Sequence, residues 1–219
     1  MGSCSHPGTG RTDTAQTHLQ SDAPLVGVLA YQGDFRDHIR LLESLQMRTR
    51  SVRSVEDLED CAGLVIPGGE STTIGKLLQR FGVGDRVQQL AAEGFPILGT
   101  CAGCILLAQT IEGSDQYRLG LLDISVQRNA YGRQVDSFEA ELPLRGDESA
   151  TTRGVFIRAP RITSIGHRIE VLATIDGAPA AVSYENLVAA TFHPELGGAS
   201  WLHKLFLERV ATYHDRLRH

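Results

Sequence analysis

Short apolar runs alternate with amphipathic stretches along the first half of the chain. The apolar runs have the continuous character of strands buried on both faces, and they cover residues 25–33 (LVGVLAYQG), 62–69 (AGLVIPGG) and 95–100 (FPILGT). Helical spacing predicts helices over residues 34–45, 71–81 and 102–111; in the first, one stripe holds Phe35, Ile39, Leu42 and Leu45, and Asp34 stands at the capping position. Strands that alternate with helices indicate crossover units and a parallel sheet.

The rhythm changes between about residues 121 and 188. Short strands without intervening helices are predicted over residues 123–127, 137–142, 154–158, 168–175 and 179–184. They indicate an antiparallel insertion at one edge of the sheet. A further strand (187–192) and an amphipathic helix (200–217) then close the chain. The predicted fold class is therefore α/β, an open and mostly parallel twisted sheet flanked by helices, with an antiparallel strand insertion.

The first 23 residues differ in composition from the rest. They are rich in Gly, Ser, Thr and Asp, and they have no apolar run of the kind that a signal peptide needs. We expect residues 1–23 to be a disordered extension or a cloning remnant, and residues 24–219 to form one domain.

Charge and cysteine content exclude several classes of function. The formal net charge of −5 gives no basic surface for a nucleic-acid backbone. No apolar run approaches the roughly 20 residues that cross a bilayer, so we expect no membrane partner. The four cysteines are too few and too unevenly spaced for a disulfide framework, which suggests a reducing compartment and a cytoplasmic location.

Two cysteine patterns overlap in the segment PILGTCAGC. Cys101 and Cys104 form a Cys-x-x-Cys pair, which is typical of a redox dithiol or half of a metal site. Cys101 also lies in Gly-x-Cys-x-Gly at a predicted strand-to-helix turn, where small neighbours allow a strained nucleophile and the helix start favours the thiolate. This second pattern favours Cys101 as a single nucleophile.

Two more predicted strand ends carry polar chemistry. After the strand LVIP, Gly68 and Gly69 allow backbone N–H groups to converge on an anion, although a tight turn before a helix capped by Ser71 would look the same. In TFHPEL, His193 and Glu195 are two apart, so in extended backbone their side chains project to the same side. With Cys101 they predict a nucleophile, base and orienting carboxylate.

These motifs resemble a known family. Gly-x-Cys-x-Gly, Pro-Gly-Gly and the late His-Pro-Glu are similar to the triad-type (class I) glutamine amidotransferases, which have a flavodoxin-like fold. Within that group, the chain from about residue 25 to 210 resembles the glutaminase subunits of pyridoxal 5′-phosphate synthase. The matching segments are LAYQGDFRDH, PGGESTTI, GTCAG, QRNAYGRQVDSFE, FIRAP and FHPEL. Tyr31 and Cys104 depart from the pattern, because an aliphatic residue is expected at each.

The resemblance implies a role for each matching residue. Cys101 would attack the side-chain amide of L-glutamine, His193 would move the proton, Glu195 would hold His193, and Gly68 and Gly69 would form the oxyanion hole. It further implies no cofactor and no metal, and a glutamine-binding set made of Gly69, Glu70, Ser71, Arg128, Ile157 and Arg158. Arg128 has independent support, because a guanidinium pairs bidentately with an α-carboxylate.

The implied partner is a synthase subunit that receives the ammonia in a large hetero-oligomeric ring assembly and makes pyridoxal 5′-phosphate. Three alternatives remain open at this point. One is a glutaminase that serves another ammonia-using synthase. A second is a thiol–disulfide oxidoreductase that uses Cys101 and Cys104. The third is a non-catalytic, chaperone-like relative, in which no contact between Cys101 and His193 is expected.

Overall fold

The computed structural model describes residues 23–128, 137–144, 147–198 and 200–218. The predicted N-terminal extension, apart from its last residue, lies outside them. A nine-stranded sheet forms the centre of the molecule, and five of its strands run parallel in the order β2-β1-β3-β4-β12. These strands are β1 (Leu25–Leu29), β2 (Arg48–Val52), β3 (Cys61–Ile66), β4 (Ile97–Thr100) and β12 (Leu187–Ala190).

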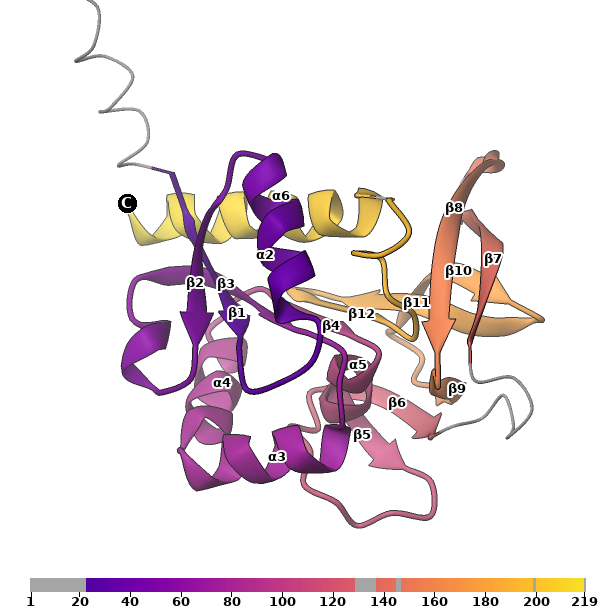
Figure 1. Ribbon diagram of the computed structural model, residues 1–219, viewed down its shortest axis with the longest axis horizontal. Helices are drawn as coiled ribbons and strands as arrows, with labels where there is room; N and C mark the ends of the chain where they lie inside the picture. Colours follow the sequence, from indigo (N-terminus) through magenta and orange to yellow (C-terminus); the bar gives the residue numbers. More distant parts are fainter. Residues whose placement is uncertain (1–22, 129–136, 145–146, 199, 219) are drawn as a thin grey trace, which may run out of the picture.

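Helices cover both faces of the parallel strands (Figure 1). One face carries α2 (Phe35–Ser44) and α6 (Trp201–Leu217), and the other carries α3 (Ser71–Arg80), α4 (Val83–Ala92) and α5 (Ala102–Leu107). Every residue of β1, β3, β4 and β12 is buried, which explains why their sequences are continuous apolar runs. The predicted open, mostly parallel sheet flanked by helices is thereby confirmed.

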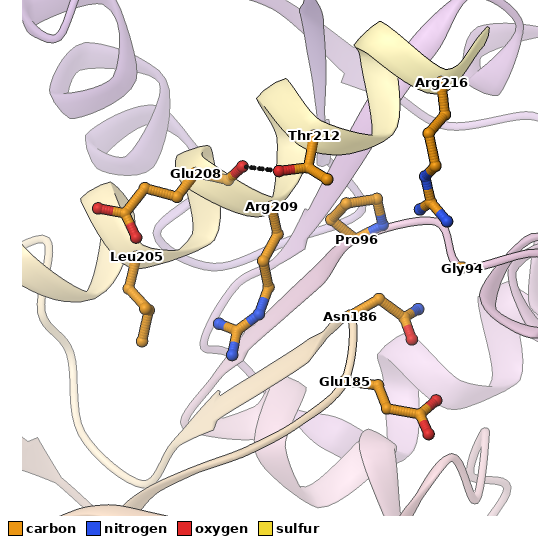
Figure 2. A pocket seen from close by; sticks show the side chains of 9 residues that line it. All are labelled: Gly94, Pro96, Glu185, Asn186, Leu205, Glu208, Arg209, Thr212 and Arg216. Atoms are coloured by element: carbon orange, nitrogen blue, oxygen red, sulfur yellow. Dashed lines mark hydrogen bonds between the residues drawn. The ribbon is translucent and has the colours of Figure 1, made fainter.

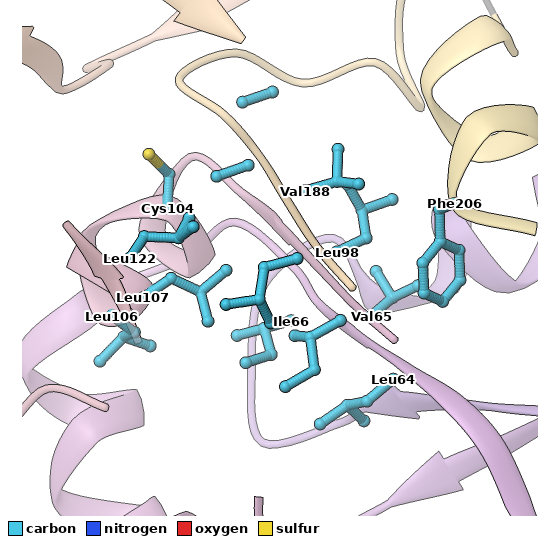
Figure 3. Close-up of a cluster of buried hydrophobic side chains, with 14 of the residues drawn as sticks. Leu64, Val65, Ile66, Leu98, Cys104, Leu106, Leu107, Leu122, Val188 and Phe206 are labelled. Atoms are coloured by element: carbon cyan, nitrogen blue, oxygen red, sulfur yellow. The ribbon is translucent and has the colours of Figure 1, made fainter. Parts of the chain in front are cut away.

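The apolar core lies between this sheet and its helices. Figure 3 shows part of it, where Leu64, Val65 and Ile66 of β3 lie near Leu98, Val188 and the ring of Phe206. All six side chains are fully buried. Because these residues come from three adjacent strands and the C-terminal helix, the core holds distant parts of the chain in register.

The predicted antiparallel insertion is also present. Beyond β12 the large sheet continues with antiparallel pairs in the order β12-β11-β10-β7-β8, and the β7–β8 hairpin stands at the end of the molecule (Figure 1). The added strands are β7 (Ser137–Leu144), β8 (Asp147–Ile157), β10 (Glu170–Ile175) and β11 (Ala178–Tyr184).

One predicted helix is too long. Helix α5 ends at Leu107, and residues 108–111 form a strand instead of continuing to residue 111 as predicted. Ala108 is extended (φ −62°, ψ 143°), and its strand pairs with a neighbour in a separate three-stranded sheet. This sheet comprises β5 (Ala108–Ile111), β6 (Leu122–Gln127) and β9 (Arg161–Ile165). Pairing with distant strands therefore overrides the local helical pattern.

The sequence patterns did not predict two strands and one helix: β2, β9 and α4. Strand β2 is an edge strand with polar, half-exposed residues, so it lacks the apolar run that reveals its neighbours. Helix α4 has the helical spacing of Val83, Val87 and Leu90, but its first turn contains a second glycine, Gly84, after Gly82. A 3-10 turn (Glu56–Leu58) also precedes β3.

The parallel strands bring their carboxyl ends to one edge of the sheet. The segments that leave this edge contain Asp34 after β1, Gly68 after β3, Cys101 after β4 and His193 after β12. Ligand sites in open α/β sheets lie at such edges. In the described part of the chain, every helix is too short or too polar to span a membrane.

Candidate functional site

Cys101 occupies the turn between β4 and α5 in a strained conformation. Its φ is 48° and its ψ is −101°, outside the regions that ordinary L-residues prefer. Its backbone N–H donates to Ala190 O at 2.9 Å, which ties the turn to β12. A Cβ on Gly103 would lie 2.0 Å from Ile66 O, so this glycine lets the turn pack against β3. The small residues predicted around the nucleophile are thus required by close backbone approach.

His193 and Glu195 form the predicted pair beside this turn. Nδ1 of His193 lies 2.8 Å from Oε1 of Glu195, and the Glu195 side chain is completely buried. The side chains of His193 and Cys101 line the same cavity and interact electrostatically. The structure therefore brings together all three members of the predicted triad, and the contact expected to be absent from a chaperone-like relative is present.

Burial and neighbouring groups shift the pKa values of His193 and Glu195. Burial alone lowers the pKa of His193, but its hydrogen bonds and charge interactions with Cys101 and Glu195 outweigh burial and raise the pKa to about 10. Burial raises the pKa of Glu195, and the hydrogen bond from His193 opposes that rise. These interactions favour an imidazolium at His193, with Cys101 beside the ring and Glu195 bonded to Nδ1.

Gly68 and Gly69 lie next to the imidazole. A Cβ on Gly68 would lie 2.3 Å from Cε1 of His193, so any side chain there would displace the ring. Gly69 has a φ of 144°, which favours glycine. The Pro-Gly-Gly turn therefore combines contact with His193 and a backbone conformation that other residues adopt only under strain.

A cavity of about 420 Å³ opens over these groups. Most of the predicted site residues line it, whereas Gly68 and Glu195 lie outside its lining. Asp34 and Ile105 were not predicted but also contribute to the wall. The predicted members of the lining are Gly69, Glu70, Ser71, Cys101, Arg128, Ile157, Arg158 and His193.

Ile157 and Arg158 contribute to the cavity wall through their backbone. Ile157 O accepts a long hydrogen bond, 3.8 Å, from Sγ of Cys101. Arg158 follows with a φ of 46° at the end of β8. Both lie on the wall that the antiparallel insertion supplies, so this insertion completes the cavity.

Arg128 is held at the cavity wall by three neighbours. Its guanidinium donates to Glu70 Oε1 at 3.2 Å, to Gln116 Oε1 at 2.7 Å and to Thr72 Oγ1 at 3.2 Å. About a third of the side chain stays exposed. The adjoining residues 129–136, which contain most of the motif RNAYGRQVDSF, lie outside the described residues.

Neither candidate cap makes the expected capping hydrogen bond. Glu70, not Ser71, is the N-cap of α3, and its carboxylate accepts from the backbone N–H groups of Thr72 and Thr73. Ser71 is buried and hydrogen-bonds with Gln116. Asp34 precedes α2 but makes no capping hydrogen bond there.

The Asp34 carboxylate is oriented toward His193 instead. Its Oδ2 lies 3.4 Å from Nδ1 of His193. Together with Glu195, these groups offer three potential metal-ligand atoms within 4.8 Å of one another. Because Nδ1 of His193 is already hydrogen-bonded to Glu195, we interpret the cluster as a charge environment for the imidazole.

The structure also reveals buried polar residues that the motifs did not indicate. His38 on α2, Thr100 on β4 and His203 on α6 lie behind the triad, and all three are fully buried. One signal was available in the sequence: His38 follows Phe35 by three residues and precedes Leu42 by four, so it lies on the apolar stripe of its helix. A histidine in such a stripe indicates a buried polar contact.

Cys104 does not share the setting of Cys101. It is completely buried within the apolar cluster near Leu106, Leu107 and Leu122 (Figure 3), and burial raises the pKa of its thiol well above the usual range. A thiol that stays protonated is a poor redox partner. The structure therefore disfavours the Cys101–Cys104 oxidoreductase alternative.

A second cavity, of about 470 Å³, lies where α6 passes the loops that precede β4 and β12 (Figure 2). Pro96 and Asn186 line it, immediately before the amino ends of those strands, together with Arg209 and Arg216 of α6. It contains no member of the triad. The cavity of about 420 Å³ is thus the better candidate, because it contains the predicted nucleophile Cys101, the predicted base His193 and Arg128.

Comparisons with known proteins point to one family. The family model of the SNO glutamine amidotransferases matches residues 28–212. A pyridoxal 5′-phosphate synthase subunit PdxT from Pseudothermotoga lettingae is 50% identical over 190 residues, which are 86% of this chain and 97% of the relative. The same-named protein from Desulforudis audaxviator is 50% identical over 187 residues, 84% of this chain and 98% of the relative.

Solved structures show the same fold. A crystal structure described as a glutamine amidotransferase has a TM-score of 0.81 and 47% identity, covering 85% of this chain and 98% of its own. A chain in the structure of PurLQS from Thermotoga maritima has a TM-score of 0.64 and 19% identity, covering 87% of this chain and 99% of its own. At that identity the second likeness concerns the fold alone.

Proposed function

Because this chain belongs to the SNO glutamine amidotransferase family, we propose that it hydrolyses L-glutamine to L-glutamate and ammonia through Cys101. The observation that carries the proposal is that Cys101 and His193 line one cavity together with Arg128, and that His193 is hydrogen-bonded to the buried Glu195. A strained thiol beside an oriented imidazole is the arrangement that acyl transfer through a thioester needs.

The first half-reaction forms the thioester. The Cys101 thiolate attacks the side-chain amide carbon of glutamine, and the resulting oxyanion is stabilised by N–H groups of the Gly68-Gly69 turn. The C–N bond then breaks as the His193 imidazolium gives its proton to the departing nitrogen, which leaves as ammonia. The raised pKa of His193 keeps that proton available at neutral pH.

The second half-reaction releases glutamate. Water attacks the γ-glutamyl thioester, His193 accepts a proton from the water, and the C–S bond breaks to restore the thiolate. Glu195 holds the imidazole in the same tautomer through both steps, since its Oε1 accepts from Nδ1. One imidazole thus serves as acid and then as base.

The cavity wall would bind the amino-acid end of glutamine. Arg128 would pair with the α-carboxylate, and Glu70, at the opposite end of the ion pair with Arg128, would attract the α-ammonium group. Gly69, Ser71, Ile157 and Arg158 complete the proposed binding set in the same cavity. No cofactor or metal is part of this mechanism.

The relatives' name suggests the destination of the ammonia. We propose that the chain is the glutaminase subunit of a pyridoxal 5′-phosphate synthase, that it docks on the synthase subunit in a large hetero-oligomeric ring assembly, and that the ammonia enters vitamin B6 biosynthesis there. We expect this to occur in the cytoplasm, where a nucleophilic thiol stays reduced.

The test is glutamate production from glutamine by the purified chain, with and without the synthase subunit of the same organism, with Cys101→Ala as the matched control. We expect glutamate release in the complex and its loss in the control. No release in either setting would contradict the glutaminase assignment. Equal release with and without the synthase would contradict the coupling and would favour a different ammonia acceptor.

A further inference from the structure

Two buried histidines lie directly behind the triad. His38 comes from α2 and His203 from α6, and each is 0% exposed. Nδ1 of His38 lies 2.9 Å from Nε2 of His203, and the ring centroids are 5.1 Å apart. Neither residue lines the cavity that contains Cys101. The proposed chemistry therefore gives no direct role to either ring, although burying two imidazoles is costly.

The opposite side of His38 contacts two parts of the site. Its Nε2 lies 3.1 Å from Thr100 Oγ1, and Thr100 immediately precedes the nucleophile. The same Nε2 lies 3.2 Å from Oε2 of Glu195, the carboxylate oxygen that is not bonded to His193. His38 thus bridges the strand end that carries Cys101 and the segment that carries Glu195.

The hydrogen-bonding requirement of the Glu195 carboxylate indicates which ring nitrogens of His38 and His203 carry hydrogen. Oε2 is buried, and among the described residues it has no aligned hydrogen-bond donor. A hydrogen on Nε2 of His38, shared between Thr100 Oγ1 and Oε2, supplies that oxygen with a donor group. Nδ1 of His38 then carries no hydrogen and accepts from Nε2 of His203.

The protonation of both rings agrees with this assignment. Burial, followed by the nearness of His203 and His193, lowers the pKa of His38 well below its usual value, and burial lowers that of His203 to about 4. Both imidazoles are therefore neutral near pH 7, and each has one N–H to donate. Nδ1 of His203 has no hydrogen-bond partner among the described residues, as expected for the bare end of the series.

We propose that His38 is a positioning residue for the catalytic triad: its neutral imidazole donates from Nε2 toward the Glu195 carboxylate and Thr100, and His203 fixes its tautomer. The inference deepens the proposed glutaminase function and rests on it. His38 acts by keeping Glu195 ionised and turned toward His193. Without this N–H, the buried carboxylate holds a proton to higher pH and loses its fixed orientation.

The main test compares His38→Leu with His38→Gln in the complete chain assembled with its synthase subunit. Leucine keeps the apolar volume and removes the donor, whereas the glutamine amide nitrogen reaches the position of Nε2. We expect kcat to fall about 10- to 100-fold in His38→Leu, the size of a lost hydrogen bond to a charged group, with KM little changed. His38→Gln should recover most of that loss.

A second readout does not depend on glutamine. The rate at which iodoacetamide alkylates Cys101, followed by mass spectrometry of its peptide across pH, reports the thiolate. The titratable groups around His38 are His203 from α6, Glu195 and His193 from the segment after β12, and Asp34, which faces His193. The acid limb of alkylation should move to higher pH in His38→Leu, because a protonated Glu195 stabilises the imidazolium–thiolate pair less.

Matched controls separate positioning from packing. Leu42→Val perturbs another fully buried side chain of α2 and should leave both the alkylation profile and kcat nearly unchanged. If His38→Leu does not fold, His38→Asn replaces it, since its shorter amide cannot reach Glu195 and should behave unlike His38→Gln.

The outcomes are distinguishable from failure of the proposed function. A wild-type complex without glutaminase activity contradicts the function, while the alkylation profiles still test His38. If His38→Leu and His38→Gln have the same kcat and the same alkylation profile, His38 only fills space and the positioning proposal is wrong.

Discussion

Replacing Cys101 by glycine is expected to stabilise the fold relative to replacing it by alanine. Both substitutions remove Sγ, but only glycine removes Cβ from a residue with φ 48° and ψ −101°. A non-glycine residue held in such a region stores about 1–3 kcal/mol of strain. The comparison therefore measures the strain of the nucleophile turn separately from the loss of the thiol.

The magnitude follows from two opposing effects. Glycine gains about 2 kcal/mol from relief of strain, and it loses about 0.4–1 kcal/mol because the unfolded chain has more freedom. The net preference for Cys101→Gly over Cys101→Ala is thus about 1 kcal/mol. Cys104 is the matched control: it is buried in the interior of α5, where alanine should exceed glycine by about 1 kcal/mol.

The assay is urea unfolding of the four variants, followed by circular dichroism, with the free energy of unfolding extrapolated to water. The free energy of unfolding should be about 1 kcal/mol higher for glycine than for alanine at position 101, and about 1 kcal/mol lower for glycine than for alanine at position 104. If alanine is favoured at Cys101 as strongly as at Cys104, the turn is unstrained and the reasoning is refuted. Both Cys101 variants should also lose glutamine hydrolysis by more than about 1000-fold.

Three further predictions concern the triad and its surroundings. In the synthase complex, His193→Asn should lose nearly as much activity as Cys101→Ala, because it removes proton transfer. Glu195→Gln should lose less activity, because it keeps the size of the side chain and changes only its charge and the orientation of His193. Equal kcat in wild type and His193→Asn would contradict the triad. Acid should lower the free energy of unfolding more in the wild type than in His203→Leu, because the pKa of His203 is about 4 in the folded protein and about 6.5 in the unfolded chain, which therefore binds the proton first. Between pH 7.5 and pH 5 the wild type should lose about 2 kcal/mol more than the variant, measured by urea unfolding at both pH values. Equal losses in the two proteins would count against this. Peroxide should inactivate Cys104→Ala as fast and as irreversibly as wild type, because the buried Cys104 thiol has no redox role. If the wild type alone loses activity more slowly or reversibly, a disulfide between Cys101 and Cys104 is indicated.

The motifs near the strand ends could be interpreted from sequence because their physics is local. Gly-x-Cys-x-Gly describes one turn. His193 and Glu195 are two residues apart, and a second turn, closed by the hydrogen bond from Leu196 N–H to His193 O, brings their side chains within 2.8 Å. The buried parallel strands could also be predicted, since a strand covered on both faces is an apolar run wherever it lies in the sheet.

Other features depend on contacts between residues far apart in the chain. Residues 108–111 continue a helical pattern but pair with β6, and Ser71 looks like a cap but turns to Gln116, 45 residues away. Asp34 likewise looks like a cap, although its carboxylate lies beside His193. In each case local propensity is worth less than a buried contact supplied by tertiary packing.

The layer behind the triad is the clearest example. The sequence places His38 on the apolar stripe of a helix, but its partner His203 is 165 residues away and comes from another helix. Only the packing of α2 and α6 on one face of the sheet brings these rings together and directs one of them at Glu195. The sequence by itself was enough to predict Cys101, His193 and Glu195 as nucleophile, base and orienting carboxylate, because each lies in a short motif with its own geometry. The tertiary structure decided what holds that carboxylate in place, because a buried charge takes its hydrogen-bond donors from whichever elements the core packs against it.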